Sequence, residues 1–396
     1  MEKSAIDEIK YYEIPIGDTF FLDARKKIST SSNREVHPGR KRDDNKLVSI
    51  KLEKICHSPT LFKEAKALRH LKDIERIPNL IWMGEQGKYF ILIMDLLGPS
   101  LGFLKEKCNG KFSLATTLKI SVQLLKILEQ IHDKGVIIRY LKPDNMVLGL
   151  NENANFVYLI DFGTAKFYIK KGEHIKYVEN KYHIKGNRDF ISINYHKRSE
   201  ASRRDDIESL GYNLVNFMKG KLPWTDLNDS KLILQKKIDT SLDELCEGLP
   251  GEFKEFIDYA RKLEFKERPN YSYLNELLIK AAKNNDIDLD KVEYDWINLK
   301  INEKKVKDVS SNEEHKENKI KESENGSEAK DDNNKEKKEL INNEKNDELN
   351  DKNEDMIKKK ELNENIIQEK ENSEENKKII ENEIINKENR QEQEKI

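Results

Sequence analysis

The most restrictive feature of this sequence is the distribution of its aromatic residues. All 14 Tyr, 14 Phe and 3 Trp of the 396-residue chain lie in the first 300 residues, and residues 301–396 contain neither an aromatic residue nor a proline. A packed core needs large apolar side chains to offset the entropy lost on folding. We therefore expect the core to lie within residues 1–300.

Residues 301–396 have the composition of a disordered segment. They contain 18 Asn, 21 basic and 29 acidic residues, and such a segment has too little apolar surface to fold on its own. We predict that it is disordered and dispensable for folding. The isoleucine pairs at 366–367 and 379–380 indicate transient helix. They do not keep a steady heptad, so a coiled coil is the less favoured alternative.

The composition of the whole chain also limits its class and its partners. The three cysteines, Cys56, Cys108 and Cys246, show no metal-ligand spacing and indicate buried thiols in a reducing compartment. Residues 1–12 lack an apolar signal core, and the apolar run 89–97 is too short to span a bilayer. The net charge of −2 gives no attraction to nucleic acid. We expect a soluble protein of the cytoplasm, with the nucleus as a further compartment, and neither a membrane nor a nucleic-acid partner.

Hydrophobic periodicity predicts strands early in the chain and helices later. Strands are predicted over residues 46–52, 88–98 and 155–163, and helices over 58–72, 113–134 and 205–220. The last helix is apolar nearly all round, so it should be central. This order favours an α+β fold with a small β-rich lobe followed by a larger helical lobe.

One charged residue interrupts an apolar helix stripe. Ser58 is a good N-cap and Pro59 suits the first position of the helix, and Glu64 then falls on the same stripe as Leu61 and Leu68. Burying a carboxylate is unfavourable unless a cation meets it. From the residues alone, Glu64 either sits at the edge of the stripe in water or is paired with a cation.

Eight short motifs carry a family resemblance. They are MDLLGPSL (94–101), LKPDNMVLG (141–149), IDFGTAK (160–166), SINYH (192–196), SRRDDIESLGY (202–212), LPW (222–224), RPNYSYL (268–274) and YDWINLK (294–300). In order and spacing they resemble motifs of the casein kinase I family of serine/threonine protein kinases, over roughly residues 20–300.

The resemblance implies a bilobal protein-kinase fold with an additional segment at each end. The expected divisions are an N-terminal extension (1–19), a kinase N-lobe (20–97), a C-lobe (98–300) and the Asn/Glu/Lys-rich tail (301–396). It also implies ATP and Mg²⁺ as cofactors, and a protein substrate or partner proteins.

The resemblance further implies roles for individual residues. Lys51 stands where a strand lysine holds the α- and β-phosphates, and Glu64 where a helix glutamate pairs with that lysine. Asn145 and Asp161 stand at the two metal-ligand positions, where they offer the hard oxygen donors that Mg²⁺ requires. Lys142 would neutralise charge on the transferred phosphoryl group.

The implied nucleotide site is built from both lobes. Met94 takes the gatekeeper position, residues 95–97 form the hinge beside adenine, and Asp206 is expected to cap the catalytic loop from the central helix, a structural role. The predicted nucleotide-binding residues are Ile28, Val36, Ser49, Lys51, Met94, Asp95, Leu97 and Val147.

The catalytic loop departs from the kinase signature. The stretch VIIRYLKPDNMVLG (136–149) has Ile138 in place of the signature His and Tyr140 in place of the catalytic Asp. That aspartate accepts the proton of the substrate hydroxyl. A tyrosine, with a pKa near 10, is a poor base at neutral pH, and loss of a positioned base typically lowers the rate roughly 10²- to 10⁴-fold. Ile138 also removes a polar ring that supports the loop.

Two further departures concern anion binding. The phosphate loop, residues 28–36, has Ser29, Ser31 and Arg34 where the family has glycines that permit close approach of backbone N–H groups to phosphate. Fit to the phosphates should suffer, with partial compensation from the hydroxyls and the arginine. Asp189 replaces an arginine of the family's anion pocket, with Arg188 one place earlier. A preference for pre-phosphorylated substrates is therefore not expected to carry over.

Three functional hypotheses follow from these residues. The first is a pseudokinase that binds nucleotide and acts through partner proteins in signalling. The second is an active serine/threonine kinase that transfers the γ-phosphate of ATP weakly and without the usual base. The third is a nucleotide-independent interaction platform. Retention of Lys51, Glu64, Asn145 and Asp161 argues against the third, because a half-satisfied buried polar cluster is unfavourable.

Overall fold

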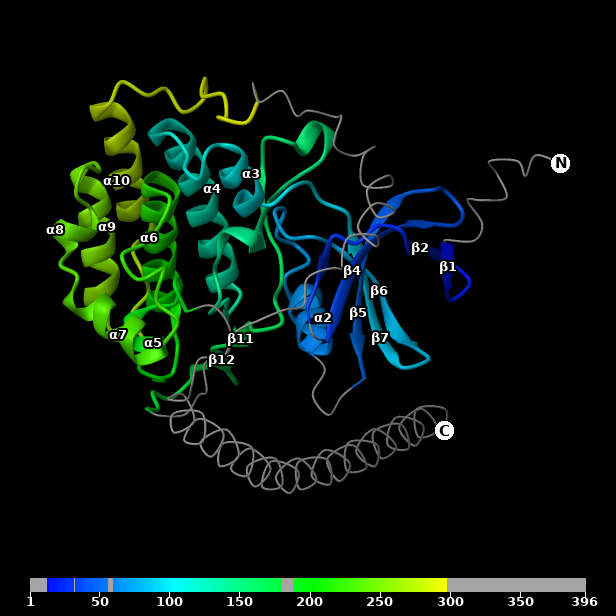
Figure 1. The fold of residues 1–396 in the computed structure, drawn as a ribbon. Coiled ribbons are helices and arrows are strands. Elements are labelled where there is room, and N and C mark those ends of the chain that lie inside the picture. Colours follow the sequence, from blue (N-terminus) through cyan, green and yellow to red (C-terminus); the bar gives the residue numbers. More distant parts are fainter. Residues whose placement is uncertain (1–12, 32, 56–59, 180–187, 298–396) are drawn as a thin grey trace, which may run out of the picture. The chain divides into compact units, whose positions relative to one another are not determined.

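The N-terminal lobe is an antiparallel sheet with one helix beside it (Figure 1). The computed structural model describes residues 13–31, 33–55, 60–179 and 188–297. The sheet order is β1-β2-β4-β5-β7-β6, and β3 pairs with β4. The strands are β1 (Glu13–Ile16), β2 (Phe20–Asp23), β3 (Ser29–Thr30), β4 (Arg34–Lys41), β5 (Leu47–Lys54), β6 (Leu80–Gln86) and β7 (Tyr89–Asp95), and the helix is α2 (Thr60–His70).

The sheet begins earlier than the predicted start of the lobe at residue 20. Strand β1 lies inside the predicted extension 1–19 and pairs with β2, with Ile16 opposite Phe20. Both side chains are buried in the same apolar cluster, which explains why this segment joins the fold. Pro15 is compatible with β1 because β1 is an edge strand. The predicted cap at Ser58 and Pro59 and the predicted tail lie outside the described residues.

Alternation along the central strands separates the two faces of the sheet. Val48 and Ile50 of β5, with Ile91 and Ile93 of β7, pack in a cluster on one face. The residues between them point to the other face, where Leu92 and Met94 join the main core of the protein. The period-2 prediction for β5 is therefore confirmed. Lys51, by the same alternation, lies on the face of the main core.

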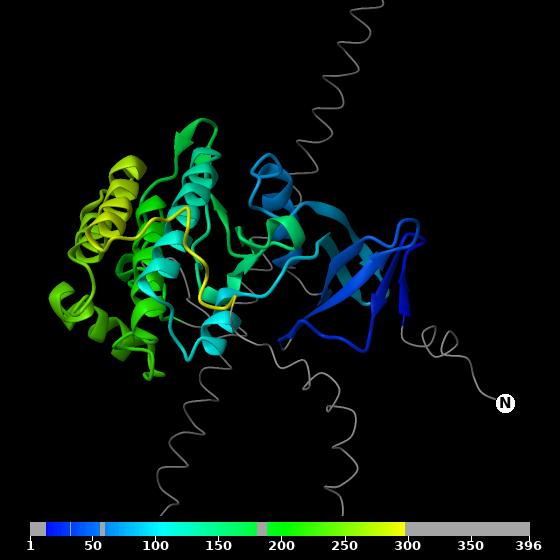
Figure 2. The same ribbon diagram turned by 90° about the horizontal axis from the view of Figure 1, so that it is seen from above.

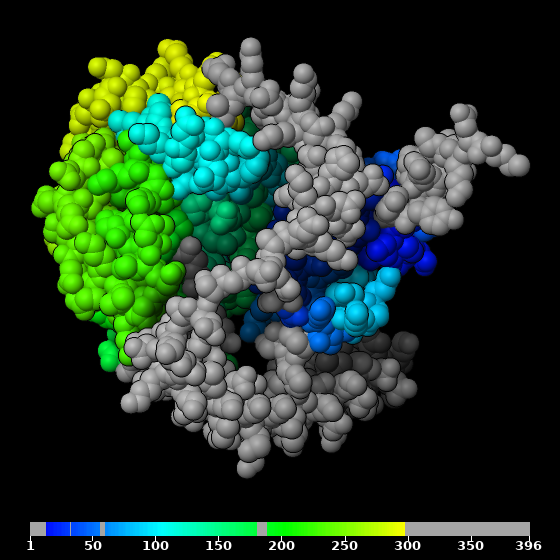
Figure 3. All heavy atoms as spheres, viewed as in Figure 1, coloured from blue at the N-terminus to red at the C-terminus, as the bar shows by residue number. Residues whose placement is uncertain are grey.

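The second lobe is mainly helical. Helices α4, α6, α9 and α10 lie side by side in both views (Figures 1 and 2) and contact one another. The helices are α3 (Leu101–Lys107), α4 (Leu114–Asp133), α5 (Ile193–His196), α6 (Arg203–Lys219), α7 (Ser230–Asp239), α8 (Leu242–Leu245), α9 (Gly251–Lys262) and α10 (Tyr271–Asn284). The space-filling view shows the surface of this lobe in cyan, green and yellow and the N-terminal strands in blue (Figure 3).

Short elements between residues 136 and 174 carry loops of the site. These are β8 (Val136–Ile137), η1 (Pro143–Asn145), β9 (Met146–Leu148), η2 (Asn151–Asn153), β10 (Val157–Leu159), β11 (Lys166–Phe167), β12 (Ile169–Lys170) and β13 (Glu173–His174). The strand predicted over 155–163 is shorter than expected because residues 160–163 form a loop. The helices predicted over 113–134 and 205–220 are confirmed to within two residues.

Helix α6 is central, as its sequence predicts. Its residues from Asp205 to Phe217 are all buried. The helix begins with a capping box. In this box the Asp205 carboxylate accepts a hydrogen bond from the Ser202 backbone N–H at 2.7 Å. Within the described ranges, no helix is long and apolar enough to cross a membrane.

A histidine of α5 makes stability depend on pH. Burial, reinforced by Lys237 and Arg188, lowers the pKa of His196 to about 4. The folded pKa is below the unfolded value, so the neutral form stabilises the fold above about pH 6.5, and this contribution is lost as the pH falls toward 4. His196 Nε2 lies 3.0 Å from Ser230 Oγ, and a glutamine amide can replace that contact.

We expect His196→Gln to reduce the sensitivity of stability to acid. From pH 7 to pH 4.5, the wild type should lose about 2 kcal/mol more unfolding free energy than the variant. Urea unfolding of both proteins at the two pH values measures the difference. Equal losses would show that His196 does not titrate with the fold.

Candidate nucleotide site

Strand register sets one wall of the site. Across β4, β5 and β7, Lys51 lies opposite Val36 and Leu92, and Ser49 lies opposite Met94. Directly paired residues point to the same face of a sheet. These side chains therefore line one surface, the face of the main core.

Lys51 forms an ion pair with α2. Its Nζ donates to Glu64 Oε1 at 2.6 Å, and Glu64 is fully buried. This confirms the pairing expected from the family resemblance and excludes a solvated Glu64. Burial raises the pKa of the Glu64 carboxyl, and the Lys51 charge opposes the rise. Glu64 Oε2 has no hydrogen-bond partner among the described residues, so the carboxylate depends on Lys51.

The opposite wall is a loop held from the central helix. Asp206 of α6 accepts hydrogen bonds from the backbone N–H groups of Ile138 and Arg139, both at 2.7 Å. The predicted capping role of Asp206 is confirmed. Its carboxylate also lies 3.0 Å from His132 Nε2, and the other ring nitrogen of His132 contacts the Tyr271 hydroxyl. Sequence reasoning missed His132 and Tyr271, although His132 continues the buried stripe of Leu125 and Leu128 in α4 and could have been recognised as a buried polar residue.

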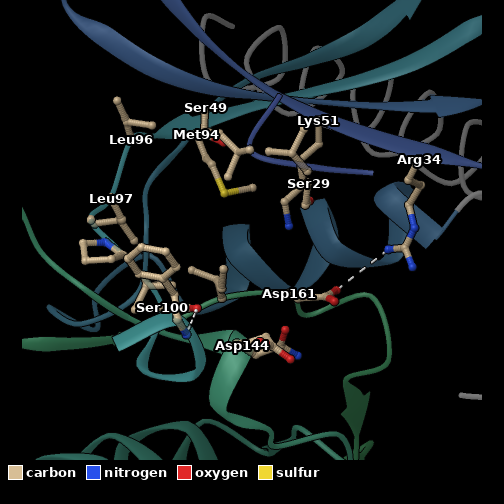
Figure 4. Close-up of a pocket in the computed structure, with 18 of the residues that line it drawn as sticks. Ser29, Arg34, Ser49, Lys51, Met94, Leu96, Leu97, Ser100, Asp144 and Asp161 are labelled. Carbon is tan, nitrogen blue, oxygen red and sulfur yellow. Dashed lines mark hydrogen bonds and ion pairs between the residues drawn. The ribbon is translucent and has the colours of Figure 1, made fainter. Parts of the chain in front are cut away.

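A cavity of about 610 Å³ lies between these walls. Figure 4 shows Ser49, Met94 and Lys51 on one side and Asp144 and Asp161 on the other. The described residues that line it include all eight predicted nucleotide-binding residues: Ile28, Val36, Ser49, Lys51, Met94, Asp95, Leu97 and Val147. They also include three predicted catalytic or metal-binding residues: Lys142, Asn145 and Asp161.

The cavity has further lining residues that were not predicted. They include Ser100, Phe103 and Asp144. Phe103 is half exposed, and α3 places it there because Ser100 caps that helix by accepting from the Phe103 N–H at 3.1 Å. No periodic signal marks such rim residues. Their position follows from the packing of α3 against η1.

Asp161 lies at the end of the cavity opposite the hinge and meets a basic side chain. Its Oδ1 is 4.0 Å from an Arg34 guanidinium nitrogen, drawn as a dashed line in Figure 4. Asp161 adopts a positive φ of 65°, a conformation uncommon outside glycine. Lys142 Nζ lies 3.5 Å from the Asp144 carboxylate nearby. Cations and carboxylates are therefore mixed at this end.

A family model described as "Protein kinase domain" matches residues 24–278. The chain belongs to the protein kinase family. The bilobal α+β fold predicted from the sequence is therefore confirmed, with a curled β-sheet N-lobe and a helical C-lobe. Kinase domains of this family generally use ATP and Mg²⁺ and act on proteins.

The metal-ligand positions of this kinase domain have suitable chemistry. Asp161 offers a carboxylate and Asn145 an amide oxygen, both hard donors that suit Mg²⁺. The Asn145 Nδ2 group donates to the Tyr140 backbone oxygen at 3.3 Å. The amide oxygen of Asn145 takes no part in this hydrogen bond. A bound Mg²⁺ would neutralise charge on the phosphate oxygens. The predicted metal roles of Asn145 and Asp161 stay predictions.

Tyr140, which the family resemblance predicts at the position of the catalytic base, is not one of the described lining residues of the cavity. It is partly exposed, and its ring centroid lies 5.6 Å from Lys142 Nζ. A phenol keeps its proton at neutral pH because its ordinary pKa is near 10. The residue at this position therefore lacks a carboxylate able to accept a substrate proton.

The loop of residues 136–149 is held in place although Ile138 stands where the kinase signature has a histidine. Ile138 is buried in the main hydrophobic cluster together with Phe162. Its backbone N–H donates to Asp206, and its carbonyl accepts from Thr164 Oγ1 at 3.2 Å. Main-chain hydrogen bonds and apolar packing therefore hold this loop.

In the predicted phosphate loop, β3 pairs with β4, and the described residues do not need glycine. Ser29 pairs with Val36 across β3 and β4, and the Ser31 N–H donates to the Arg34 carbonyl at 2.8 Å. Of residues 28–31 and 33–36, none has a positive φ. The described backbone is therefore accessible to serine and arginine. The predicted weaker fit to phosphates is not tested by this geometry.

At residues 188–189, where the sequence departs from the family's anion pocket, buried side chains of the helical lobe bind the backbone. Lys237 of α7 is fully buried, and its Nζ donates to the carbonyls of Arg188 and Ile191 at 2.6 Å. The Asp189 carbonyl accepts from Trp224 Nε1 at 2.8 Å. The backbone of this segment is thus anchored to the helical lobe.

Proposed function

We propose that this chain is a casein kinase I-like kinase domain that binds ATP with Mg²⁺, is impaired in phosphotransfer, and acts in signalling through partner proteins. The proposal rests on a contrast between the residues that line the cavity and the residue at the predicted base position. Lys51, Asn145 and Asp161 line the cavity, whereas the base position beside it holds Tyr140. The eight motifs in register support the family assignment.

The nucleotide-binding part of the proposal rests on the chemistry of the lining. Apolar Val36, Met94 and Val147 form surfaces that suit a planar base, and Lys51 supplies a cation for phosphate. Glu64 holds Lys51 at 2.6 Å, so the ammonium group is positioned before a ligand arrives. This arrangement favours nucleotide binding over a nucleotide-independent platform.

The impairment follows from the acid–base chemistry of one position. In protein kinases, the aspartate at the position of Tyr140 orients the substrate hydroxyl and accepts its proton. Tyr140 is a poor base for that proton at neutral pH, because the ordinary pKa of a phenol is near 10. A weakly active kinase is the second candidate, because Lys142 is on the cavity wall and phosphoryl transfer depends chiefly on positioning and electrostatics.

We expect ATP with Mg²⁺ to stabilise the folded protein. Binding to the native state alone raises the unfolding free energy by about 2.7 kcal/mol when the ligand concentration is a hundred times Kd. A thermal-shift titration with ATP and Mg²⁺ should therefore raise the Tm by a few degrees. A Tm that millimolar ATP leaves unchanged, in protein shown to be folded by circular dichroism, would contradict nucleotide binding.

A further inference from the structure

Arg34 reaches the phosphate end of the cavity because of strand register. It lies opposite Glu53 in the β4–β5 pair, two residues before Val36, which lies opposite Lys51. Alternation along a strand places Arg34, Val36, Lys51 and Glu53 on the same face. Arg34 therefore projects over the site, as Figure 4 shows.

Two carboxylates hold the Arg34 guanidinium at this end. One is Asp161, at 4.0 Å, and the other is Glu53, also at 4.0 Å. Glu53 is buried and fixed, because it accepts hydrogen bonds from Thr60 Oγ1 at 2.7 Å and from the Leu61 N–H at 2.9 Å at the start of α2. Glu53 therefore offers the guanidinium a second, fixed negative charge on the side of the sheet and α2.

The other two cations among the described lining residues at this end also have carboxylate partners. Lys51 is paired with Glu64, and Lys142 lies 3.5 Å from Asp144. A triphosphate entering the cavity would also meet the negative charge of Asp161. At such a position a bound cation is usually the largest local charge and offsets this repulsion. Here Arg34 already brings positive charge to Asp161.

We propose that Arg34 supplies, at Asp161, the positive charge that a divalent ion provides in other kinase sites, so that the cavity binds ATP without requiring Mg²⁺. Arginine suits this task, because its planar guanidinium stays charged and can donate two hydrogen bonds to one phosphate. The Arg34 and Asp161 side chains are 36% and 30% exposed, so the guanidinium keeps donors available to a ligand. Asp161 and Asn145 can still accept Mg²⁺; the inference concerns only whether ATP needs it.

This inference rests on the nucleotide binding proposed above, and one set of binding measurements separates the two. The dissociation constant of ATP is measured by calorimetry with Mg²⁺ and with EDTA, for wild type, Arg34→Met and Arg34→Lys. Methionine keeps an unbranched side chain and removes the charge, whereas lysine keeps the charge. Lys27→Ala is the matched control, because it removes an exposed cation near the same hairpin whose partner is Glu35 at 2.9 Å.

We expect the affinity for ATP to depend on Mg²⁺ only when the positive charge at position 34 is removed. For wild type, Arg34→Lys and Lys27→Ala, the dissociation constants of ATP in EDTA and in Mg²⁺ should agree within about threefold. For Arg34→Met, the dissociation constant in EDTA should be at least tenfold higher than in Mg²⁺. A wild type that loses tenfold or more in EDTA would overturn the inference while leaving nucleotide binding intact. So would an Arg34→Met variant that binds ATP more tightly than wild type in both buffers, because Arg34 would then obstruct the site. Absence of ATP binding by all four proteins in Mg²⁺ would overturn the proposed function as well.

Discussion

Replacing Tyr140 with aspartate should raise phosphotransfer to casein at least tenfold, which corresponds to about 1.4 kcal/mol of activation free energy. An aspartate at this position is ionised at neutral pH, since its ordinary pKa is near 3.9. The Tyr140 backbone oxygen, which accepts from Asn145, is unaffected by the change of side chain. Lys142 also gains a carboxylate neighbour in place of an aromatic ring. Transfer of ³²P from labelled ATP measures the change.

A matched variant distinguishes the effect of the new carboxylate from the effect of removing the tyrosine ring. Tyr140→Asn has nearly the size and shape of Tyr140→Asp but cannot accept a proton. If the carboxylate matters, Tyr140→Asp should exceed Tyr140→Asn in activity by most of the predicted factor. Equal gains from both would assign the effect to removal of the ring. No gain from either, in proteins that bind ATP, would show that Tyr140 does not limit the reaction.

The second large effect is on stability, and it follows from the buried Lys51–Glu64 pair. Lys51→Met leaves the fully buried Glu64 carboxylate without its cation. Removing one partner of a buried ion pair typically lowers the unfolding free energy by about 3–5 kcal/mol. We expect a loss in this range at pH 7, measured by urea unfolding. Because burial raises the pKa of Glu64, protonation of the carboxyl should make the loss smaller at pH 5 than at pH 7.

A second substitution tests whether the loss arises from the isolated charge. Adding Glu64→Gln to Lys51→Met replaces the carboxylate with a neutral amide of the same shape, and should restore most of the lost stability. A double variant as unstable as Lys51→Met would indicate that packing of the Lys51 side chain is responsible. The double variant also provides a control for phosphotransfer assays, because it lacks the lysine that is proposed to hold the phosphates.

The sequence predicts the architecture and the main site residues where local patterns reflect long-range contacts. Alternation in β5 places Lys51 on the face of the main core, and the apolar stripe of α2 places Glu64 against it, so the pair could be predicted once the motifs indicated a kinase. The central position of α6 follows from apolar residues that occur nearly all round the helix. These features are predictable because burial of a strand or helix constrains every residue along it.

The features that sequence reasoning missed depend on contacts between distant segments. The approach of Arg34 to Asp161 requires the β4–β5 register and the position of Glu53, neither of which a single motif encodes. The support of Asp206 by His132 and Tyr271 joins α4, α6 and α10. Strand β1 lies within the predicted N-terminal extension, and its four residues, which include a proline, give too weak a periodic signal to predict a strand.

Phosphotransfer by the wild-type protein, measured at an ATP concentration that saturates its demonstrated binding, tests the central claim most directly. The account predicts that ATP occupies the site while transfer to casein stays at the level of the folded Lys51→Met, Glu64→Gln variant. Transfer by the wild type well above that level, unchanged by Tyr140→Asp, would contradict the account and identify an active kinase that works without the usual base.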